Sequence, residues 1–138
     1  MKQYHLAIVV VGLICGCQSS RQNPSDGAAL EPFVGSYYRG DGLGYNILLD
    51  LSHDGSYGAE WHGCLGLYGT ARGSWSVSGE QILLSPSKEK DMLEGHLRQL
   101  DVVKHGDQWI LVQSDDREFY DAHGLSAYSC FQNRDASE

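Results

Sequence analysis

The chain has 138 residues, of which 41% are hydrophobic and 20% are charged. This composition is too apolar for a disordered protein, and the length allows one hydrophobic core rather than two. The formal net charge of −8 argues against a nucleic-acid partner, because binding to phosphates depends on clustered Lys and Arg. Seventeen Gly and eight Tyr against three Pro favour an all-β fold, since glycine serves tight turns and aromatic side chains suit strands.

Residues 1–16 have the three-part layout of a signal peptide. Lys2 gives a positively charged start, and residues 6–14 form an almost unbroken apolar run. A helix of that length covers about 14 Å, roughly half the hydrocarbon core of a bilayer, so it is too short for a permanent span. Residues 14–17 (Ile-Cys-Gly-Cys) resemble the bacterial lipobox. The resemblance implies that Cys17 is lipidated and becomes the first residue of the exported chain.

The lipobox resemblance also implies a partner and a location. Several acyl chains on Cys17 would hold the protein to a lipid bilayer, whereas a single chain binds only marginally. Gln18, rather than Asp, resembles the signal for release to the outer membrane (periplasmic face) in a Gram-negative bacterium. The alternative is an ordinary cleaved signal peptide with an incidental cysteine. Residues 17–32, which are polar after the cysteine, are expected to form a flexible tether, and residues 33–134 a β domain.

Two cysteines remain after the leader is removed and Cys17 is modified. Cys64 and Cys130 would then lie in an oxidising compartment, and we expect a disulfide between them. Such a bridge would close a loop of about 65 residues, for which the chain-entropy model gives roughly 4 kcal/mol. The alternative is a reactive thiol, because His62 and Cys64 would share one face of a strand. No further Cys or nearby acid completes a metal site around them, so we expect no metal and no cofactor.

Short strand-like runs separated by turn residues begin near residue 33. The first is residues 34–39, and residues 45–52 follow with alternating aliphatic side chains. Asp54 and Gly55 then predict a hairpin turn into a returning strand over residues 56–62. Further strands are expected over residues 65–77, 81–85, 97–103 and 109–113. Residues 86–95 are charged and predict a loop or a short helical turn.

The C-terminal part breaks the strand pattern. Residues 115–123 are predicted to be a short helix, capped by Ser114, with a capping-box pair from Asp115 to Glu118. Phe119 and Tyr120 are expected on its buried side. Residues 125–132 would form a last strand that returns Cys130 to the sheet. The predicted fold is therefore an antiparallel meander of seven or eight strands, closing into a small lipocalin-like barrel or a curved sheet, with a sandwich as the alternative.

Three segments carry a family resemblance: residues 35–37 (Gly-Ser-Tyr), residues 49–57 with their Asp-Gly turn, and residues 73–84. They resemble small bacterial lipoproteins with lipocalin-like or META-like β domains, over residues 34–85. Residues 109–112 and the acidic helix after them resemble the ends of uncharacterised proteins of that kind. The resemblance implies a β-barrel or strongly curved sheet and an envelope location, and it brings no catalytic residues.

The sequence holds no Gly-x-Ser-x-Gly, His-Glu-x-x-His, phosphate-loop or EF-hand pattern, so we expect no enzyme. The leading hypothesis is a membrane-anchored, non-catalytic binding or envelope-maintenance module with an unknown envelope protein as partner. One alternative is a lipocalin-type carrier of a small apolar ligand, and another is a thiol-dependent enzyme that uses Cys64 and His62. Strand aromatics would either fill the barrel or line the carrier's pocket. These aromatics are Tyr37, Tyr57, Trp61, Trp75 and Trp109.

Overall fold

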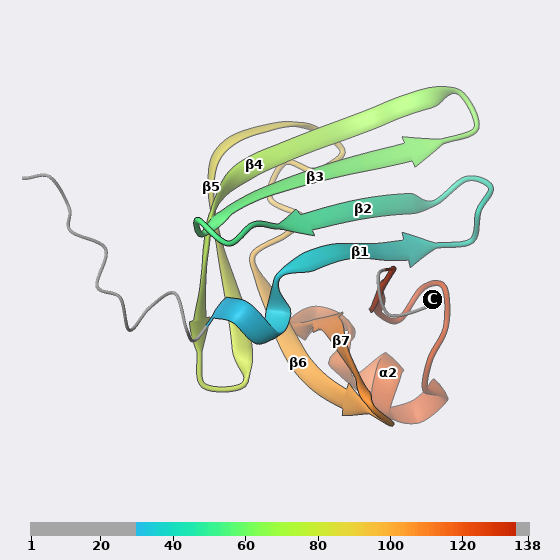
Figure 1. Cartoon of the computed structure of the whole chain (residues 1–138). Coiled ribbons are helices and arrows are strands. Elements are labelled where there is room, and N and C mark those ends of the chain that lie inside the picture. The colour runs from blue at the N-terminus through green and yellow to red at the C-terminus, as the bar shows by residue number, and fades with distance from the viewer. Residues whose placement is uncertain (1–29, 135–138) are drawn as a thin grey trace, which may run out of the picture.

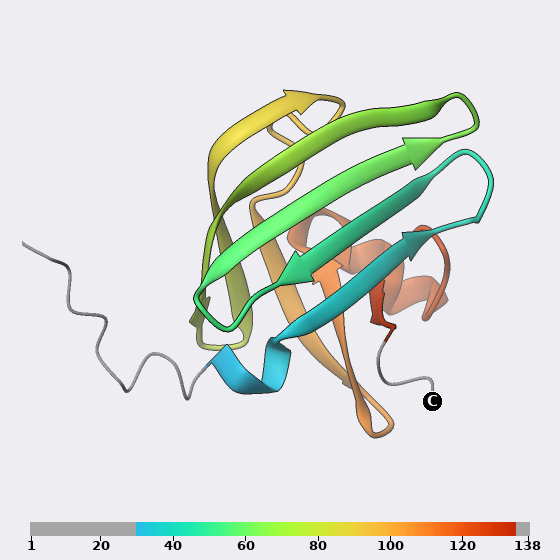
Figure 2. The same cartoon turned by 45° about the horizontal axis from the view of Figure 1, so that its top comes forward.

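The computed structural model describes residues 30–134, which form a closed barrel of eight antiparallel strands in chain order (Figures 1 and 2). The strands are β1 (Gly35–Gly40), β2 (Asn46–Leu51), β3 (Ser56–Gly63), β4 (Gly66–Ser78), β5 (Gln81–Asp91), β6 (Gln99–His105), β7 (Gln108–Gln113) and β8 (Phe131–Asn133). The helical segments are the 3-10 helices η1 (Glu31–Phe33) and η2 (Ser114–Asp116) and the α-helix α2 (Arg117–His123). The predicted all-β meander, its closure into a barrel and the short helix near the C-terminus are confirmed.

Period-two alternation places the barrel's interior side chains. On β2, Ile47, Leu49 and Leu51 are buried, as their spacing predicts. The predicted hairpin between β2 and β3 is also present: Gly55 has φ of 77°, and Asp54 accepts hydrogen bonds from the backbone N–H and hydroxyl of Ser56. The turn therefore uses the left-handed conformation that glycine adopts without steric cost.

β5 is longer than predicted. The expectation of a loop or helical turn over residues 86–95 is wrong for residues 86–91, which continue β5 and pair with β4 as far as Gly69↔Asp91. Pro86 fits because it lies at an irregularity in the β4–β5 register, opposite Gly73. β5 pairs with β6 only at residues 81–83, so its second half is an edge with charged side chains in solvent.

The barrel closes through a very short strand. β8 makes only two residue pairs with β1 and two with β7. The predicted last strand over residues 125–132 is thus largely wrong, since most of that segment forms turns and only its end joins the sheet. The last strand brings Phe131 rather than Cys130 into register with Leu111 of β7.

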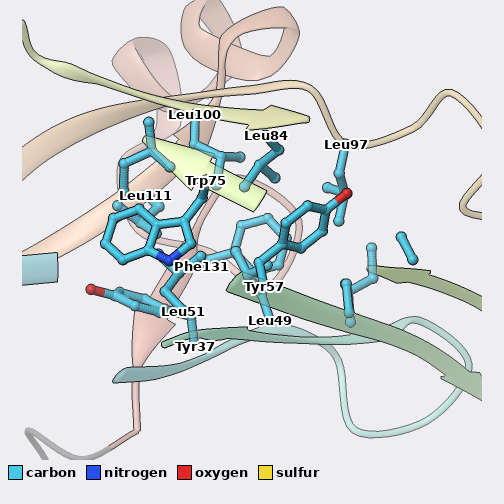
Figure 3. Packing of buried hydrophobic residues seen from close by; sticks show 14 of the residues in the cluster. Tyr37, Leu49, Leu51, Tyr57, Trp75, Leu84, Leu97, Leu100, Leu111 and Phe131 are labelled. Carbon is cyan, nitrogen blue, oxygen red and sulfur yellow. The ribbon is translucent and has the colours of Figure 1, made fainter. Parts of the chain in front are cut away.

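Side chains from every side fill the barrel interior (Figure 3). Tyr37, Tyr57, Trp75 and Phe131 turn toward one another and belong to one cluster of buried residues. The remaining members that Figure 3 labels are aliphatic: Leu49, Leu51, Leu84, Leu97, Leu100 and Leu111. The volume between strands is thus occupied by a hydrophobic core, as small eight-stranded barrels allow.

The two ends of the barrel are covered differently. At one end, which we call the η1 end, lie η1 and the β2–β3, β4–β5 and β6–β7 turns (Figure 2). There the Tyr37 hydroxyl donates to the Phe33 carbonyl, and Trp75 donates through Nε1 to the Ser52 carbonyl at 3.0 Å. The opposite end, the loop end, has the β1–β2 and β3–β4 turns and the β5–β6 connection, from which Leu97 is fully buried.

Helix α2 covers the outside of β7, so residues 110–113 of this strand are buried on both faces. Ile110, Val112 and Cys130 form a second small core there, with Tyr120 packed against it. Phe119 differs from the prediction: it is 45% exposed and stacks on a histidine of its own helix. The predicted cap and capping box are wrong too.

Ser114 does not cap the helix because its hydroxyl is used elsewhere. It donates to the Asp101 carboxylate at 2.9 Å, and neither η2 nor α2 has a side-chain cap hydrogen bond. Within residues 30–134, no helix is long and apolar enough to cross a membrane.

Candidate functional site

The five aromatic residues predicted to line a pocket do not share one site. Tyr37, Tyr57 and Trp75 belong to the filled core. Trp61 lies near the loop end, half-buried, in edge-to-face contact with Tyr45 at 4.9 Å between ring centroids. Trp109 lies near the η1 end, where it is 37% exposed and packs its ring on Phe33 at 5.8 Å. The arrangement is that of a core with one aromatic contact at each end.

The predicted disulfide is absent from the structure, in which both cysteines within residues 30–134 are free. Cys64 is exposed in the β3–β4 turn, and its thiol donates to the Leu43 carbonyl at 3.4 Å. Cys130 is 1% exposed, packed under α2 with Ile110 and Val112. The prediction depended on the number of cysteines and on an oxidising compartment. In the fold, Cys64 lies in an exposed turn and Cys130 in a buried core. Cys17 lies outside the described residues.

The thiol-dependent alternative requires Cys64 as nucleophile next to His62 as base, and the structure does not pair them. His62 contacts Glu60 through Nε2 at 2.8 Å, and no hydrogen bond joins it to Cys64 within the described part of the chain. A register shift between Trp61 and His62 interrupts the alternation that would have placed the two side chains together.

A buried arginine joins the strands where the barrel closes. Arg39, on β1, is 6% exposed and donates to the Gln113 side-chain oxygen and to the Tyr128 carbonyl. Its Nη1 lies 2.7 Å from the Asp116 carboxylate. These contacts link β1 to the end of β7, to η2 and to the segment before β8. We call this group the Arg39 clamp, and its role is structural, since it spans the seam where the ladder has only two residue pairs on each side.

Aromatic side chains and a histidine lie next to the Arg39 clamp at the loop end. The guanidinium lies 5.5 Å from the Tyr45 ring centroid, and the Trp61 ring lies 5.1 Å from His96. Burial, and then the charge of Arg39, lower the pKa of His96, so its ring is neutral near pH 7. Among residues 30–134, Trp61 Nε1 and His96 Nε2 are buried without a hydrogen-bond partner. His96 also lines a cavity of about 170 Å³, which is below the range of about 300–1,000 Å³ that small-molecule sites occupy.

A different feature is open to solvent: a groove of about 480 Å³ on the outer surface of β2–β5. Its volume lies in the range of small-molecule sites, about 300–1,000 Å³. The lining residues are Leu48, Asp50, Gly58, Ala59, Glu60, Thr70, Ala71, Arg72, Lys88 and Lys90. We call it the outer groove.

Gly58 leaves space in the outer groove without a structural need for glycine. A Cβ built there meets nothing within 4 Å, and its φ is not positive. Other strand glycines are sterically required: a Cβ would lie 2.2 Å from the Tyr45 carbonyl oxygen at Gly40 and 2.1 Å from that of Ser85 at Gly73. A glycine inside a strand costs roughly 0.5–1 kcal/mol relative to alanine, so Gly58 lowers stability where the fold would accept a side chain.

The groove has an acidic side and a basic side. Asp50 and Glu60 come from β2 and β3, whereas Arg72, Lys88 and Lys90 come from β4 and β5. These three cations are among the ten Lys and Arg of an acidic chain, and none of them has an ion-pair partner within residues 30–134. The outer groove therefore places unpaired positive charge beside open volume.

The described residues contain no group of three or more His, Cys, Asp or Glu side chains that could hold a metal ion. Comparison of the chain with family models, with curated proteins and with solved structures finds no match. The function must therefore be argued from the residues themselves.

Sequence reasoning did not identify the outer groove, although signals for it were present. Residues 56–62 were predicted as one strand, and a glycine inside a strand often marks a close approach to a ligand or another chain. Lys88 and Lys90 alternate with Glu89 in the segment that was predicted as a loop. Because the groove combines four strands, its residues could be brought together only once the register was known.

Proposed function

We propose that this chain is an exported envelope lipoprotein, held to a bilayer through acylated Cys17, whose barrel is a non-catalytic binding module. The anchor is supported by the signal-peptide layout and the lipobox resemblance at residues 14–17. The position of the barrel is compatible with it, because Leu30 already packs against the core and the domain begins soon after the polar segment.

The order of elements gives this proposal a geometry. The chain enters the barrel through η1, at the η1 end (Figure 1). An anchor upstream of η1 leaves the loop end and the outer surface of β2–β5 free to meet other molecules. The observation that carries the binding role is the outer groove, an open volume at a glycine that the fold does not require.

The carrier alternative receives less support from the packing. An apolar ligand inside the barrel would have to replace side chains such as Tyr37, Trp75 and Phe131, each at most 4% exposed and part of one cluster. Small barrels filled in this way keep no room for cargo. We therefore place binding on the outside of the barrel.

Metabolic labelling tests the anchor. The full chain is expressed in a Gram-negative bacterium supplied with an alkyne analogue of palmitate, beside its Cys17→Ser and Cys64→Ser variants. The wild type and Cys64→Ser should carry the label and sediment with membranes, and Cys17→Ser should lose both properties. Label retained by Cys17→Ser, or a wild type without label, would overturn the proposal.

A further inference from the structure

We propose that the outer groove binds a small zwitterion, with the ligand's anionic group at Arg72, Lys88 and Lys90 and its ammonium group at Asp50 and Glu60. Short peptides with free termini and the phosphoethanolamine head group share this chemistry. The inference rests on the proposed binding role of the barrel but not on the lipid anchor, which a separate experiment tests.

The strand register sets the charges at a fixed separation. Asp50 pairs with Gly58, and Gly58 pairs with Arg72, so an acid and a base lie two strands apart with glycine between them. Neighbouring strands are 4.7–4.9 Å apart, which makes the backbone separation about 10 Å. Within the described part of the chain, no direct ion pair joins Asp50 or Glu60 to a base of the groove.

A second row of the sheet repeats this arrangement. Glu60 pairs with Thr70, and Thr70 pairs with Lys90, so again one uncharged residue separates an acid from a base. Lys88 pairs with Arg72 and strengthens the basic side of the first row. Two rows with the same order of charges make one acidic side and one basic side, which a ligand with both charges can bridge.

Size and charge together select the ligand. An extended dipeptide spans at most about 7 Å, which fits between side chains whose backbones are about 10 Å apart. A polyanion would meet Asp50 and Glu60 as well as the net charge of −8, and a simple cation would meet the three bases. Only a ligand with both signs is attracted by both sides of the groove.

Gly58 provides the means to test the site without removing any charge. Valine at this position meets no atom within 4 Å at its Cβ and suits a strand, so Gly58→Val should fold and should occupy the groove. Ser76→Val is the matched control, because Ser76 is an exposed residue of the same sheet, on β4, and does not line the groove.

The experiment is a titration of the ¹⁵N-labelled full chain in non-ionic detergent, followed by NMR amide shifts. Glycylglycine and phosphoethanolamine are the zwitterionic probes, and N-acetylglycine and ethylamine carry one charge each. We expect saturable shifts at Gly58, Thr70 and Arg72 with at least one zwitterion, and at least tenfold weaker binding of both single-charge probes. Gly58→Val should weaken zwitterion binding at least tenfold, while Ser76→Val should bind as the wild type does.

The two probes distinguish the sources of the ligand. Saturation by glycylglycine alone assigns the site to peptides, saturation by phosphoethanolamine alone assigns it to lipid head groups, and either result supports the inference. The inference is overturned if neither zwitterion shifts these amides at 50 mM, if N-acetylglycine binds as well as glycylglycine, or if Gly58→Val binds like the wild type. None of these outcomes depends on palmitate labelling of Cys17.

Discussion

Replacing Arg39 with methionine should destabilise the barrel more than any substitution of an exposed charge. Methionine keeps much of the apolar stem but removes the guanidinium that reaches Gln113, Tyr128 and Asp116. The Gln113 oxygen would then be buried without its donor. The substitution removes the Arg39 clamp at the seam where β8 pairs weakly with both neighbours.

The magnitude follows from the contacts that are lost. Hydrogen bonds to charged groups contribute about 1.5–3 kcal/mol each, and breaking a buried ion pair costs about 3–5 kcal/mol. Asp116 is 36% exposed and stays hydrated after the change, which places the loss at the low end of that range. We expect the free energy of unfolding to fall by about 3 kcal/mol, which lowers Tm by roughly 12–24 °C for a domain near 100 residues.

Urea unfolding of the full chain, followed by tryptophan fluorescence, measures this loss. Arg117→Met is the matched control, because Arg117 pairs with Asp121 at 3.0 Å and with Asp101 at 3.6 Å but is itself 42% exposed. The control should change stability by no more than about 1 kcal/mol, as exposed ion pairs do. A loss below about 1 kcal/mol for Arg39→Met would refute the view that the clamp closes the barrel.

Two further predictions concern the thiols and acid. In a native thiol titration, the wild type should show one more fast-reacting thiol than Cys64→Ser, because Cys64 is exposed and forms no disulfide. Equal counts would show that Cys64 is in a disulfide or is protected. The pKa of Asp41 is lowered from 3.8 to about 2, because its carboxylate accepts hydrogen bonds from the backbone N–H groups of Leu43 and Tyr45 and from the Tyr128 hydroxyl. The contribution of Asp41 to stability is therefore present above pH 4 and is lost toward pH 2. The urea midpoint of the wild type should fall more steeply over this window than that of Asp41→Asn, and parallel declines would contradict the assignment.

Local sequence pattern predicted the elements whose burial has a simple period. Residues 45–52 alternate because one face of β2 meets the core, and residues 110–113 are buried on both faces because α2 covers β7. Residues 86–91 were mispredicted because the second half of β5 is an edge, where charged residues are tolerated: Lys88 and Lys90 are exposed, and Glu89 pairs with Arg98.

Features that depend on long-range register could not be predicted from the sequence. The disulfide prediction failed because the number of cysteines says nothing about the distance between Cys64 and Cys130. The Arg39 clamp joins residues more than seventy positions apart, and the outer groove combines four strands. Gly58 is an example: the lack of a side chain there becomes informative only once the neighbouring strands are known to leave room for one.

Intact-mass spectrometry of the full chain, extracted from bacterial membranes, shows directly whether Cys17 is cleaved and acylated. We expect a chain that begins at Cys17 and carries the added mass of a diacylglycerol and an amide-linked acyl group. A chain of unmodified residues 1–138, or one cleaved without added acyl mass, would contradict the claim that this barrel is anchored to a bilayer.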